Sequence, residues 1–420
     1  MSRSQLTVDA LVVGGGPAGL AAATALRAEG VERVVVVERE DEAGGIPRLC
    51  AHTGFGLRDL RRVLSGPVYA RRWVERAVAA GADIRTRSMV TGWAGPGRAL
   101  VTTPGGLFEV DAGVVVLATG ARERPRAARL VPGTRPSGIF TTGQLQQWVH
   151  REHLPVGRRA LVIGAEHVSY SAVLTLREAG VRPVALVTSF RRTQTFRPFD
   201  LMTRAGLRVP VWSGTGVAGV YGRERVERVL LRDHRSNERE VAVDTVVFTG
   251  DFVPDNELAR LAGLAVDPGT RGPTCAEDGT TTAAGVFAAG NLVHPVETAD
   301  VAARRAFAVG RAAAAWLRNG GARSTPRAVV GVRVADPLLW VVPNMVNAER
   351  GADQPVLVRT RAFLDHPRLD VTQGPRLLAS HQLRSMIPNR SHHLPSGWQS
   401  LVRPGEDVLV SVFRGDGARH

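Results

Sequence analysis

The stretch that most constrains this chain is the glycine-rich segment 12–19, with the sequence VVGGGPAG. It follows a short apolar run and precedes the Ala-rich segment 20–28, which is typical of a helix. The pattern G-x-G-x-x-G between a strand and a helix indicates dinucleotide binding. Gly14 permits the tight turn, Gly16 lets the backbone approach a pyrophosphate, and Gly19 lets the helix pack closely on the strand. The helix N-terminus then offers unpaired N–H groups to phosphates.

A second apolar run supports this interpretation. Val34 to Val37 form a continuous apolar segment that ends in Glu38, roughly twenty residues after the loop. A carboxylate at that place can hold the ribose hydroxyls of a dinucleotide. The combination favours a nucleotide site over an ordinary strand–turn–helix unit.

The length and charge of the chain limit what it can be. Its 420 residues exceed what one core supports, so two or three domains are expected. The net charge is +15 and lysine is absent, which excludes Schiff-base chemistry and makes every fixed positive group a guanidinium. The arginines are scattered and lack aromatic interleaving, so we predict no nucleic-acid partner. Positive charge still favours anionic cofactors, anionic substrates or an acidic partner.

The two cysteines, Cys50 and Cys275, are too few for a disulfide framework or a Cys₄ iron–sulfur site. The N-terminal apolar stretch is interrupted by glycines, unlike a signal peptide. No run approaches the 18 apolar residues of a membrane span. The His-rich segment 391–393 lacks further spaced ligands, so no metal site is predicted. We therefore expect a cytoplasmic protein without a membrane span.

Strand and helix patterns alternate until about residue 317, and only strand patterns follow. Helices are expected over 57–64 and 68–80, and a strand over 83–90. A hairpin is expected around Pro104-Gly105-Gly106, and a buried parallel strand over 114–118. Further strands are expected at 160–163, 184–187, 207–212, 226–232, 243–249 and 285–289. Two helices are expected in the same part of the chain, one ending at 179 and one over 296–317. The strands expected in the tail are 329–334, 338–342, 356–364, 376–383 and 408–413.

Three motifs taken together resemble the two-dinucleotide-binding-domain flavoproteins: segment 14–19, Ala118-Thr119-Gly120, and segment 285–291 with the sequence GVFAAGN. The resemblance implies an α/β fold in which a split FAD-binding Rossmann-like domain carries an inserted second Rossmann-like domain. The β-type tail adds a C-terminal all-β domain. The expected parts are 1–128 for the first part of the FAD-binding domain, 129–272 for the inserted NAD(P)-type domain, 273–322 for the second FAD-binding part, and 323–420 for the β-rich domain.

The same resemblance implies which residues bind FAD. The first loop holds the pyrophosphate, the Ala-Thr-Gly turn passes the cofactor, and Asn291 contacts the ribityl chain where most of the family has Asp. An amide can still hydrogen-bond a hydroxyl. The helix after Thr298 is expected to direct its N-terminus at the flavin N1–C2=O edge and to stabilise the anionic reduced flavin. No catalytic residue is identified. The expected FAD-binding residues are Gly14, Gly16, Pro17, Ala18, Gly19, Glu38, Arg39, Gly45, Arg48, Val90, Ala118, Thr119, Gly120, Gly290, Asn291 and Thr298.

A narrower resemblance rests on segments 45–52 (GIPRLCAH), 164–169 (GAEHVS) and 290–295 (GNLVHP). They look like the FAD-binding subunits of multi-subunit amine and amino-acid dehydrogenases. That group includes opine oxidases, hydroxyproline and proline dehydrogenases, hydrogen cyanide synthase and relatives of heterotetrameric sarcosine oxidase. The resemblance spans roughly residues 10–317. Relatives often carry a Cys-rich [2Fe–2S] segment after the flavin domain, and this chain has no cysteine there, so any iron–sulfur centre is expected on a partner subunit.

The second glycine-rich loop departs from the nucleotide-binding pattern. Glu166 occupies the position where the backbone should meet a pyrophosphate, and Ser169 replaces the third glycine. A carboxylate there would repel phosphate, so we predict that this unit binds no NAD(P), or binds a nucleotide in an altered way. The opposing signal is Arg191-Arg192, because arginines at this place accommodate an NADP 2′-phosphate in other proteins.

Four further residues have two interpretations each. Cys50 has no cysteine partner at short spacing, so a packed, inert thiol is favoured over a single-cysteine peroxidase. Arg48 suits the FAD phosphates, and a role in lining the loop is the alternative. His52 and His294 could shuttle protons near the flavin, but a hydrogen-bonded structural role is favoured for each.

Three functional hypotheses follow. The first is an FAD-dependent subunit of an amine or amino-acid dehydrogenase complex, in which a companion flavin subunit oxidises the carbon–nitrogen bond. Its electrons would pass, through a small [2Fe–2S] partner if one is present, to a quinone or another acceptor. The second is a stand-alone NAD(P)H-dependent flavoprotein reductase or oxidase. The third is a non-catalytic scaffold whose bound nucleotide is structural.

Overall fold

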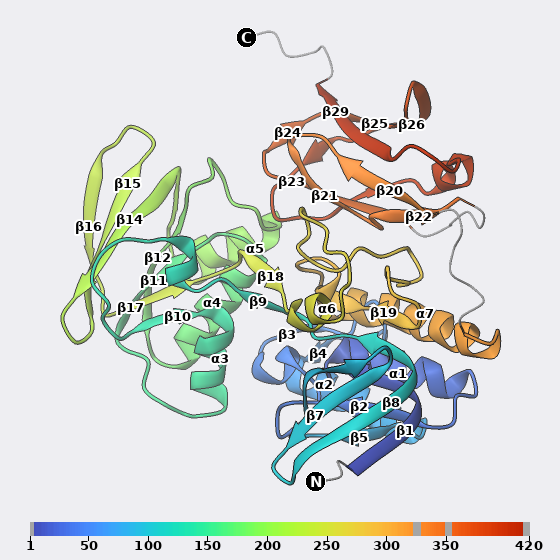
Figure 1. Cartoon of the computed structure of the whole chain (residues 1–420). Coiled ribbons are helices and arrows are strands. Elements are labelled where there is room, and N and C mark those ends of the chain that lie inside the picture. The colour runs from blue at the N-terminus through green and yellow to red at the C-terminus, as the bar shows by residue number, and fades with distance from the viewer. Residues whose placement is uncertain (1–3, 322–328, 349–354, 415–420) are drawn as a thin grey trace.

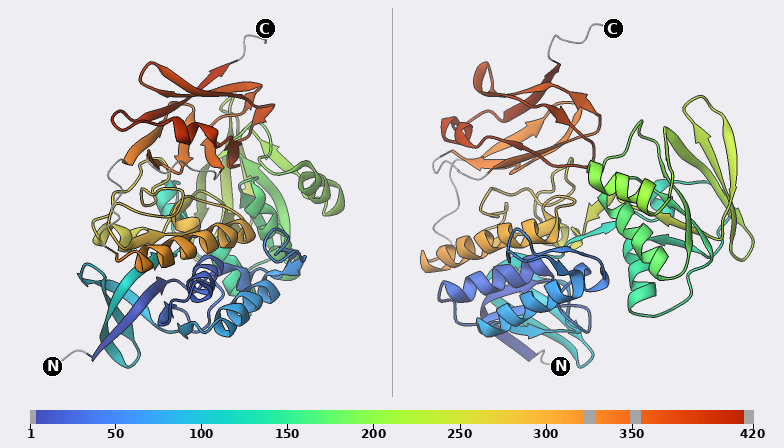
Figure 2. Two further views of the ribbon diagram at one scale, coloured as in Figure 1. Left: turned by 90° about the vertical axis from the view of Figure 1, so that its right-hand side faces the viewer. Right: turned by 180° about the vertical axis from the view of Figure 1, so that it is seen from behind.

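The computed structural model describes residues 4–321, 329–348 and 355–414. Its elements form three lobes (Figure 1). The first lobe contains the N-terminal strands together with the late helix α7 (Ala299–Arg318), the inserted lobe lies to one side of it, and the C-terminal lobe consists of strands. The right-hand view in Figure 2 shows the inserted lobe projecting beside the other two, and in the left-hand view it lies largely behind them.

The first lobe is built on a seven-stranded mixed sheet in the order β5–β2–β1–β8–β7–β6, with β19 paired to β8. Strands β5, β2, β1, β8 and β19 are parallel, whereas β7 and β6 are antiparallel. The first half of β8 forms a hairpin with β7, and its second half lies between β1 and β19. The lobe is therefore assembled from two separated parts of the chain. The bounds are β1 Ser4–Val13, β2 Val34–Val37, β5 Asp83–Arg85, β6 Met89–Gly95, β7 Arg98–Thr103, β8 Gly106–Leu117 and β19 Val286–Ala288.

Helix α1 (Pro17–Ala28) packs directly on α7 over the sheet. Gly310 of α7 allows this approach, because a Cβ there would lie 2.4 Å from the backbone oxygen of Ala22. The alanines and valines of both helices and of β1 and β8 make one buried core. Helix α2 (Gly66–Ala79) covers the same core with Trp73, and the short pair β3 (Thr53–Phe55) and β4 (Leu64–Ser65) precedes it.

The inserted lobe contains a five-stranded parallel sheet in the order β10–β17–β11–β12–β13, which helices α3 and α4 cover, and a three-stranded antiparallel sheet β14–β15–β16. The antiparallel pair β9–β18 connects this lobe to the first. The bounds are β9 Ala121–Glu123, β10 Ile139–Thr141, α3 Thr142–His150, β11 Arg159–Ile163, α4 His167–Glu178, β12 Arg182–Thr188, α5 Arg197–Leu201, β13 Val211–Ser213, β14 Thr215–Gly222, β15 Val226–Asp233, β16 Glu238–Ala242, β17 Thr245–Phe248 and β18 Phe252–Pro254. Helix α6 (Glu257–Leu261) follows β18 and packs on the core of the first lobe.

The C-terminal lobe has a mixed sheet β22–β20–β29–β25–β26, a sheet β21–β23–β28 and a pair β24–β27. Valines and leucines on their inner faces form a separate core. The bounds are β20 Val329–Val334, β21 Leu338–Val342, β22 Met345–Asn347, β23 Val356–Thr360, β24 Leu364–Asp365, β25 Pro367–Gln373, β26 Arg376–Gln382, β27 Ser385–Met386, β28 His392–Leu394 and β29 Val408–Arg414.

The predicted fold class is confirmed: a split Rossmann-like domain, an inserted Rossmann-like domain and a strand-rich C-terminal domain. The boundaries after residues 128, 272 and 322 stay predictions. The helix predicted over 57–64 was wrong, because this segment forms turns that lead into β4, and Arg61 has a φ of 53°. The strand predicted over 83–90 is two strands, β5 and β6, and the strand predicted over 356–364 is also two, β23 and β24.

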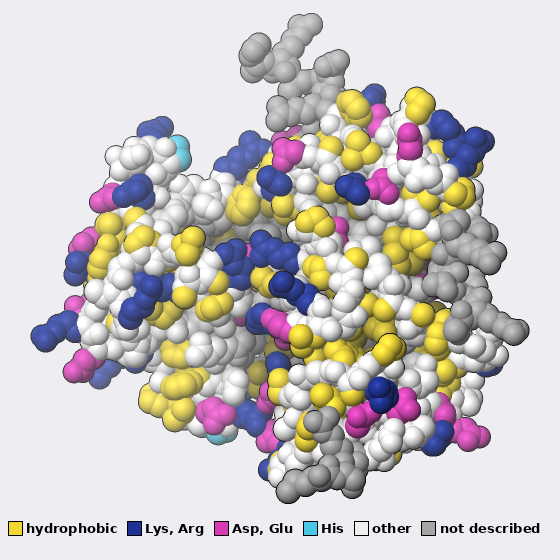
Figure 3. All heavy atoms as spheres, viewed as in Figure 1, with side chains coloured by type: hydrophobic (Ala, Val, Ile, Leu, Met, Phe, Trp, Pro, Cys, Tyr) yellow, Lys and Arg dark blue, Asp and Glu magenta, His cyan; other side chains and the backbone are white. Residues whose placement is uncertain are grey.

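Among the described residues, no helix combines the length and apolar character needed to cross a membrane. The same part of the chain contains no group of three His, Cys, Asp or Glu side chains arranged to hold a metal ion. On the face in Figure 3, the arginines lie over all three lobes and are interspersed with acidic side chains. This distribution agrees with the scattered arginines of the sequence.

Candidate functional site

The glycine-rich loop joins β1 to α1 in a geometry that two of its glycines make possible. Gly14 has a φ of 108°, donates its N–H to Val37 O, and could not carry a Cβ, which would lie 2.5 Å from Ala118 O. A Cβ at Gly19 would lie 1.9 Å from Gly14 O. Packing within the lobe therefore requires both glycines.

Gly16 differs because packing does not require it. A Cβ at Gly16 would meet only the Cα of Gly45, at an ordinary 3.8 Å. Gly16 is also the N-cap of α1, with Pro17 at the first helical position, no side-chain cap and no acidic residue in the first turn. The uncapped end of α1 is thus an anion-binding terminus open in front of Gly16, as a pyrophosphate requires.

Glu38, at the end of β2, is buried beside this loop. Its carboxylate accepts hydrogen bonds from Gly15 N at 2.8 Å and from Glu40 N at 2.9 Å. These bonds hold the side chain at the loop, where an acidic residue can meet a ribose. The neighbouring Arg39 is exposed and lies 3.9 Å from Asp255, so its predicted cofactor role has a competing partner.

Gly45, Arg48 and Val90 lie around the same region with different surroundings. The φ of 63° at Gly45 and its closeness to Gly16 bring its loop against the motif. Arg48 pairs with Glu42 at 3.3 Å and is otherwise largely buried. The Val90 side chain is in the core opposite Val101, so only its main chain, in the edge strand β6, is left for a ligand.

The other two motifs meet the loop at the carboxyl ends of neighbouring strands. Ala118-Thr119-Gly120 follows β8, and Thr119 donates its hydroxyl to Asp255 O at 2.7 Å. A Cβ at Gly290, after β19, would lie 2.5 Å from the Cβ of Ala18. The fold therefore brings together three segments that are far apart in the sequence, as an extended dinucleotide requires.

Asn291 and Thr298 are engaged by their own segment. The Asn291 amide accepts from Glu297 N at 2.9 Å and donates to Glu297 O at 3.3 Å. Thr298 is the N-cap of α7, and the buried Asp300 accepts from the hydroxyl of Thr298 and from Val301 N. The negative charge of Asp300 in the first turn of α7 offsets part of the helix dipole that is expected to stabilise the anionic reduced flavin.

The second glycine-rich loop holds a carboxylate. Glu166 accepts hydrogen bonds from Thr249 Oγ1 at 2.6 Å and from Ala165 N at 3.1 Å. The Ser169 hydroxyl lies 2.7 Å from the same Thr249 hydroxyl. A Cβ at Gly250 would lie 2.3 Å from Glu166 Oε1, so the carboxylate is packed against backbone at the N-terminus of α4.

Arg191 and Arg192 point to the C-terminal lobe. They lie 3.6 Å and 3.3 Å from the Asp365 carboxylate, and the Arg192 guanidinium stacks over Phe363 at 4.4 Å. Close by, Arg390 donates to Gln194 O at 2.7 Å and stacks over a phenylalanine of the inserted lobe. The segment that would bind an adenosine ribose in a nucleotide site is thus in contact with another lobe.

Cys50 begins a hydrogen-bond chain that sequence reasoning did not detect. Its buried thiol lies 3.5 Å from Gln146 Oε1, Gln146 donates to Ser171 Oγ at 2.8 Å, and Ser171 lies 2.8 Å from His52 Nε2. Burial raises the pKa of Cys50 to about 12, which favours the inert thiol over a reactive thiolate. Gln146 and Ser171 belong to the inserted lobe and were not detectable by spacing, because they approach Cys50 only in the folded chain.

Comparison with known proteins identifies the family. Residues 8–306 match the family described as "Pyridine nucleotide-disulphide oxidoreductase", which is more than half of the chain. The ferredoxin reductase component of chlorobenzene dioxygenase from Cupriavidus sp. (strain PS12) is 30% identical over 75% of this chain and 76% of that protein. An opine oxidase subunit from Agrobacterium tumefaciens (strain Ach5) is 27% identical over 71% of this chain, but the match spans only 64% of that protein.

Among solved structures, T. acidophilum thioredoxin reductase matches with a TM-score of 0.60 at 18% identity. The match covers 74% of this chain and 99% of that protein, so it supports the shared fold. The chain belongs to the pyridine nucleotide-disulphide oxidoreductase family and is an FAD-binding, electron-transferring oxidoreductase.

Proposed function

We propose that this chain is the FAD-binding subunit of an amine or amino-acid dehydrogenase complex acting on a substrate of the imino acid, opine or glycine type. The observation that carries this proposal is the Glu166 carboxylate in the second loop. It bears negative charge where a nucleotide would bring its phosphates, and the Thr249 hydroxyl holds it there. Electrons would then reach the flavin from a partner rather than from nicotinamide.

The contacts of Arg191 and Arg192 support the same conclusion. An NADP 2′-phosphate would have to compete with Asp365 and with the face of Phe363 for both guanidinium groups. Each contact is weak on its own, about 0.5–1 kcal/mol for an exposed cation–π pair. Together with Glu166 they disfavour nucleotide binding at both ends of the site.

The first lobe would hold FAD through the sixteen residues named from the sequence. The uncapped terminus of α1 would bind the pyrophosphate, and Glu38 would orient the ribose. Bound FAD supplies two-electron oxidation of one partner and electron delivery to another. In this assignment the chain binds and orients the cofactor, and Cys50 remains a protonated, packed thiol.

The partners would be a companion flavin-containing subunit that oxidises the substrate and a small [2Fe–2S] subunit that receives electrons. The similarity to the opine oxidase subunit supports such an assembly. Exposed apolar side chains in the segments between β2 and α2 supply a surface for it: Ile46, Leu57 and Val63 are 57%, 58% and 63% exposed. We propose a cytoplasmic location, which agrees with two free, buried cysteines.

A second candidate function is an NAD(P)H-dependent reductase of a ferredoxin-type protein. The observation that favours it is the 30% identity with the ferredoxin reductase component of chlorobenzene dioxygenase. It requires that the second loop bind a nucleotide despite Glu166.

Anaerobic mixing of the purified yellow protein with NADH or NADPH separates the two candidates. We expect no bleaching of the flavin by either nucleotide, full bleaching by dithionite, and substrate-dependent bleaching only with co-expressed neighbouring subunits. Glu166→Gly should strengthen nucleotide binding measured by calorimetry, whereas Glu240→Ala, an exposed carboxylate on β16, should not. Rapid bleaching by NADH would establish the reductase, and a colourless protein would support a structural scaffold.

A further inference from the structure

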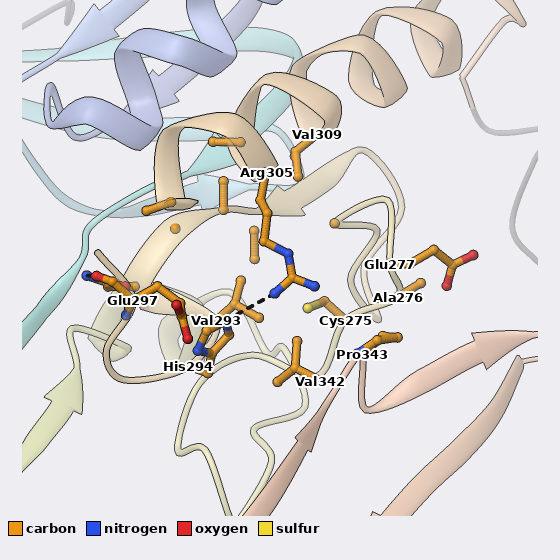
Figure 4. A pocket seen from close by; sticks show the side chains of 17 residues that line it. Cys275, Ala276, Glu277, Val293, His294, Glu297, Arg305, Val309, Val342 and Pro343 are labelled. Carbon is orange, nitrogen blue, oxygen red and sulfur yellow. Dashed lines mark hydrogen bonds between the residues drawn. The ribbon is translucent and has the colours of Figure 1, made fainter. Parts of the chain in front are cut away.

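A cavity of about 40 Å³ lies between α7 and the C-terminal lobe (Figure 4). One buried water needs roughly 10–15 Å³ by the same measure, so there is room for a few waters or a small ion. Arg305 extends from α7 into the middle of it. Gly290 and Asn291, two of the residues expected to bind FAD, belong to its lining, whereas Arg305 and His294 have no part in the proposed binding of FAD.

Arg305 is a largely buried cation that has no close carboxylate among the described residues. Its Nη1 lies 3.4 Å from His294 Nε2, and its Nη2 donates to Pro355 O at 3.2 Å. Within the described residues, no carboxylate oxygen lies within the 4.0 Å of an ion pair with this guanidinium. Burial lowers the pKa of Arg305, which means that its charge is poorly solvated. Such a group is stabilised by an anionic ligand.

His294 adds a second unsatisfied donor. The side chain is 3% exposed, and burial beside Arg305 and Arg359 lowers its pKa well below the usual value, so the ring is neutral. Because Nε2 faces a guanidinium donor, Nε2 must be the acceptor and Nδ1 must carry the hydrogen. Nδ1 is buried and has no hydrogen-bond partner in the part of the chain that the structure describes.

Arg359 repeats this pattern beside His294, although it is not among the residues that line the cavity. It is 9% exposed, donates through Nη2 to Val296 O and Ser391 Oγ, and leaves its buried Nε without a partner among the described residues. Its guanidinium lies over the Trp340 ring at 4.9 Å, and the same ring lies 5.0 Å from that of His294. His294 Nδ1 and Arg359 Nε are therefore two buried donors that lack an acceptor among the described residues.

The charges around the cavity limit which anion fits. The Glu297 carboxylate interacts electrostatically with the guanidinium groups of both Arg305 and Arg359, and it accepts a hydrogen bond from Ser391. Glu297 is thus shared between two guanidinium groups, of which only that of Arg305 lines the cavity. Glu277 also lines the cavity, but its carboxylate points away from Arg305 (Figure 4).

We propose that this cavity binds a small monocarboxylate against Arg305. A planar pair of oxygens matches the fork of a guanidinium, and a single negative charge adds least to the carboxylates of Glu277 and Glu297 that already line the cavity. Formate and acetate fit the available volume, and the carboxylate end of a larger molecule would enter in the same way. This binding site does not depend on the electron source or the acceptor of the flavin.

The test uses the purified flavin-containing protein and sodium acetate, with chloride and phosphate at equal ionic strength. Calorimetry and thermal unfolding should show saturable binding of acetate, and neither chloride nor phosphate should reproduce it. Arg305→Met should weaken acetate binding at least tenfold. Arg304→Met removes an exposed arginine from the same helix and should leave acetate binding unchanged.

Any of the following results would overturn the assignment of a monocarboxylate site. Absence of saturable acetate binding to the wild-type protein would mean that Arg305 finds its acceptor within the chain. Tighter binding of phosphate or chloride would replace the carboxylate by an inorganic anion, and equal loss in both variants would show a general charge effect. The wild-type titration does not depend on whether Arg305→Met folds. Flavin absorbance of every sample reports on the FAD site separately, so a failure there is distinguishable.

Discussion

Gly16 and Gly14 occupy the same loop for different physical reasons. Gly14 is required by its positive φ and by the oxygen of Ala118, whereas Gly16 has ordinary φ and open space in front of it. Loss of the first would disturb the fold, and loss of the second would disturb only what occupies that space. This contrast allows cofactor binding to be tested apart from stability.

Gly16→Ala is expected to keep the fold and to weaken FAD binding roughly tenfold or more, about 1.4 kcal/mol, because the methyl group occupies the pyrophosphate approach. The flavin-to-protein ratio after purification and urea unfolding measure the two effects. Gly216→Ala, where a Cβ would meet no atom within 4 Å, is the control. Full flavin occupancy of Gly16→Ala would contradict the pyrophosphate assignment.

Glu123 is a residue whose environment predicts a pH effect. Its carboxylate accepts from Gly143 N at 2.9 Å and Gly250 N at 3.1 Å, which ties β9 to the inserted lobe. Burial raises the pKa of Glu123 to about 6 from its ordinary value of 4.5. The native state therefore binds the proton more tightly than the unfolded state, and stability falls as the pH rises from about 4.5 to about 6.

Glu123→Gln should remove this loss of stability. The loss amounts to about 2 kcal/mol of unfolding free energy between pH values well below and well above the two pKa values. Denaturant unfolding at pH 4.5 and pH 7 measures it, with exposed Glu240→Gln as control. If the stability of the wild-type protein rose over this pH interval, and Glu123→Gln showed the same rise, the assignment would be contradicted.

At the scale of elements, segment 57–64 shows why a helical pattern can fail. The Asp59 carboxylate accepts from Tyr69 Oη at 2.6 Å and from Trp73 Nε1 at 2.9 Å, and also from Leu60 N. Tyr69 and Trp73 are buried on α2, so the segment turns back to meet them. Satisfying two buried donors outweighs the local helix propensity, which is worth a few tenths of a kcal/mol per residue.

Asp59→Ala should lower the free energy of unfolding by roughly 2–4 kcal/mol, because two buried donors lose their acceptor. Asp59→Asn keeps an acceptor oxygen and should cost less. Urea unfolding followed by tryptophan fluorescence measures both. Asp83→Ala, which removes an exposed carboxylate, should stay close to wild type, and an equal cost in all three variants would argue against the network.

At the scale of the whole molecule, the C-terminal lobe contacts both other lobes. Trp340, Val342 and Leu357 contribute to the core under the sheet of the first lobe. Phe363 and Arg390 reach the inserted lobe through stacking and hydrogen bonds. The strand-rich lobe therefore restrains the inserted lobe relative to the first.

Phe363→Ala should loosen this restraint. We expect amide hydrogen exchange in segment 189–196 to become roughly tenfold faster, equivalent to about 1.4 kcal/mol of lost interaction. Phe413→Ala is a matched control, since Phe413 also stacks with an arginine of the C-terminal lobe, Arg368. Unchanged exchange in segment 189–196 would show that the lobes are held by other contacts.

Local pattern alone was enough for the strand–loop–helix units and for the strand-rich tail. Apolar runs, Gly14, and the acid at position 38 act over a few residues, so their consequences are readable in order along the chain. Two other features could not be predicted from local pattern. They are the pairing of β8 with β19 and the series of hydrogen bonds that links Cys50 to His52 through Gln146. They join residues that no spacing relates, and chain topology decides which of many side chains meet.

The sequence by itself determined the Rossmann-like units, the glycine-rich loop and the presence of a carboxylate in the second loop. Only the tertiary structure decided that Glu166 is held by Thr249, that Arg191 and Arg192 face Asp365, and that Arg305 lies beside His294 in one cavity. The physical reason is the distance along the sequence over which each effect acts. Backbone propensity and periodicity act between neighbours in the chain, whereas burial, charge compensation and unsatisfied hydrogen bonds depend on which distant residues share one volume.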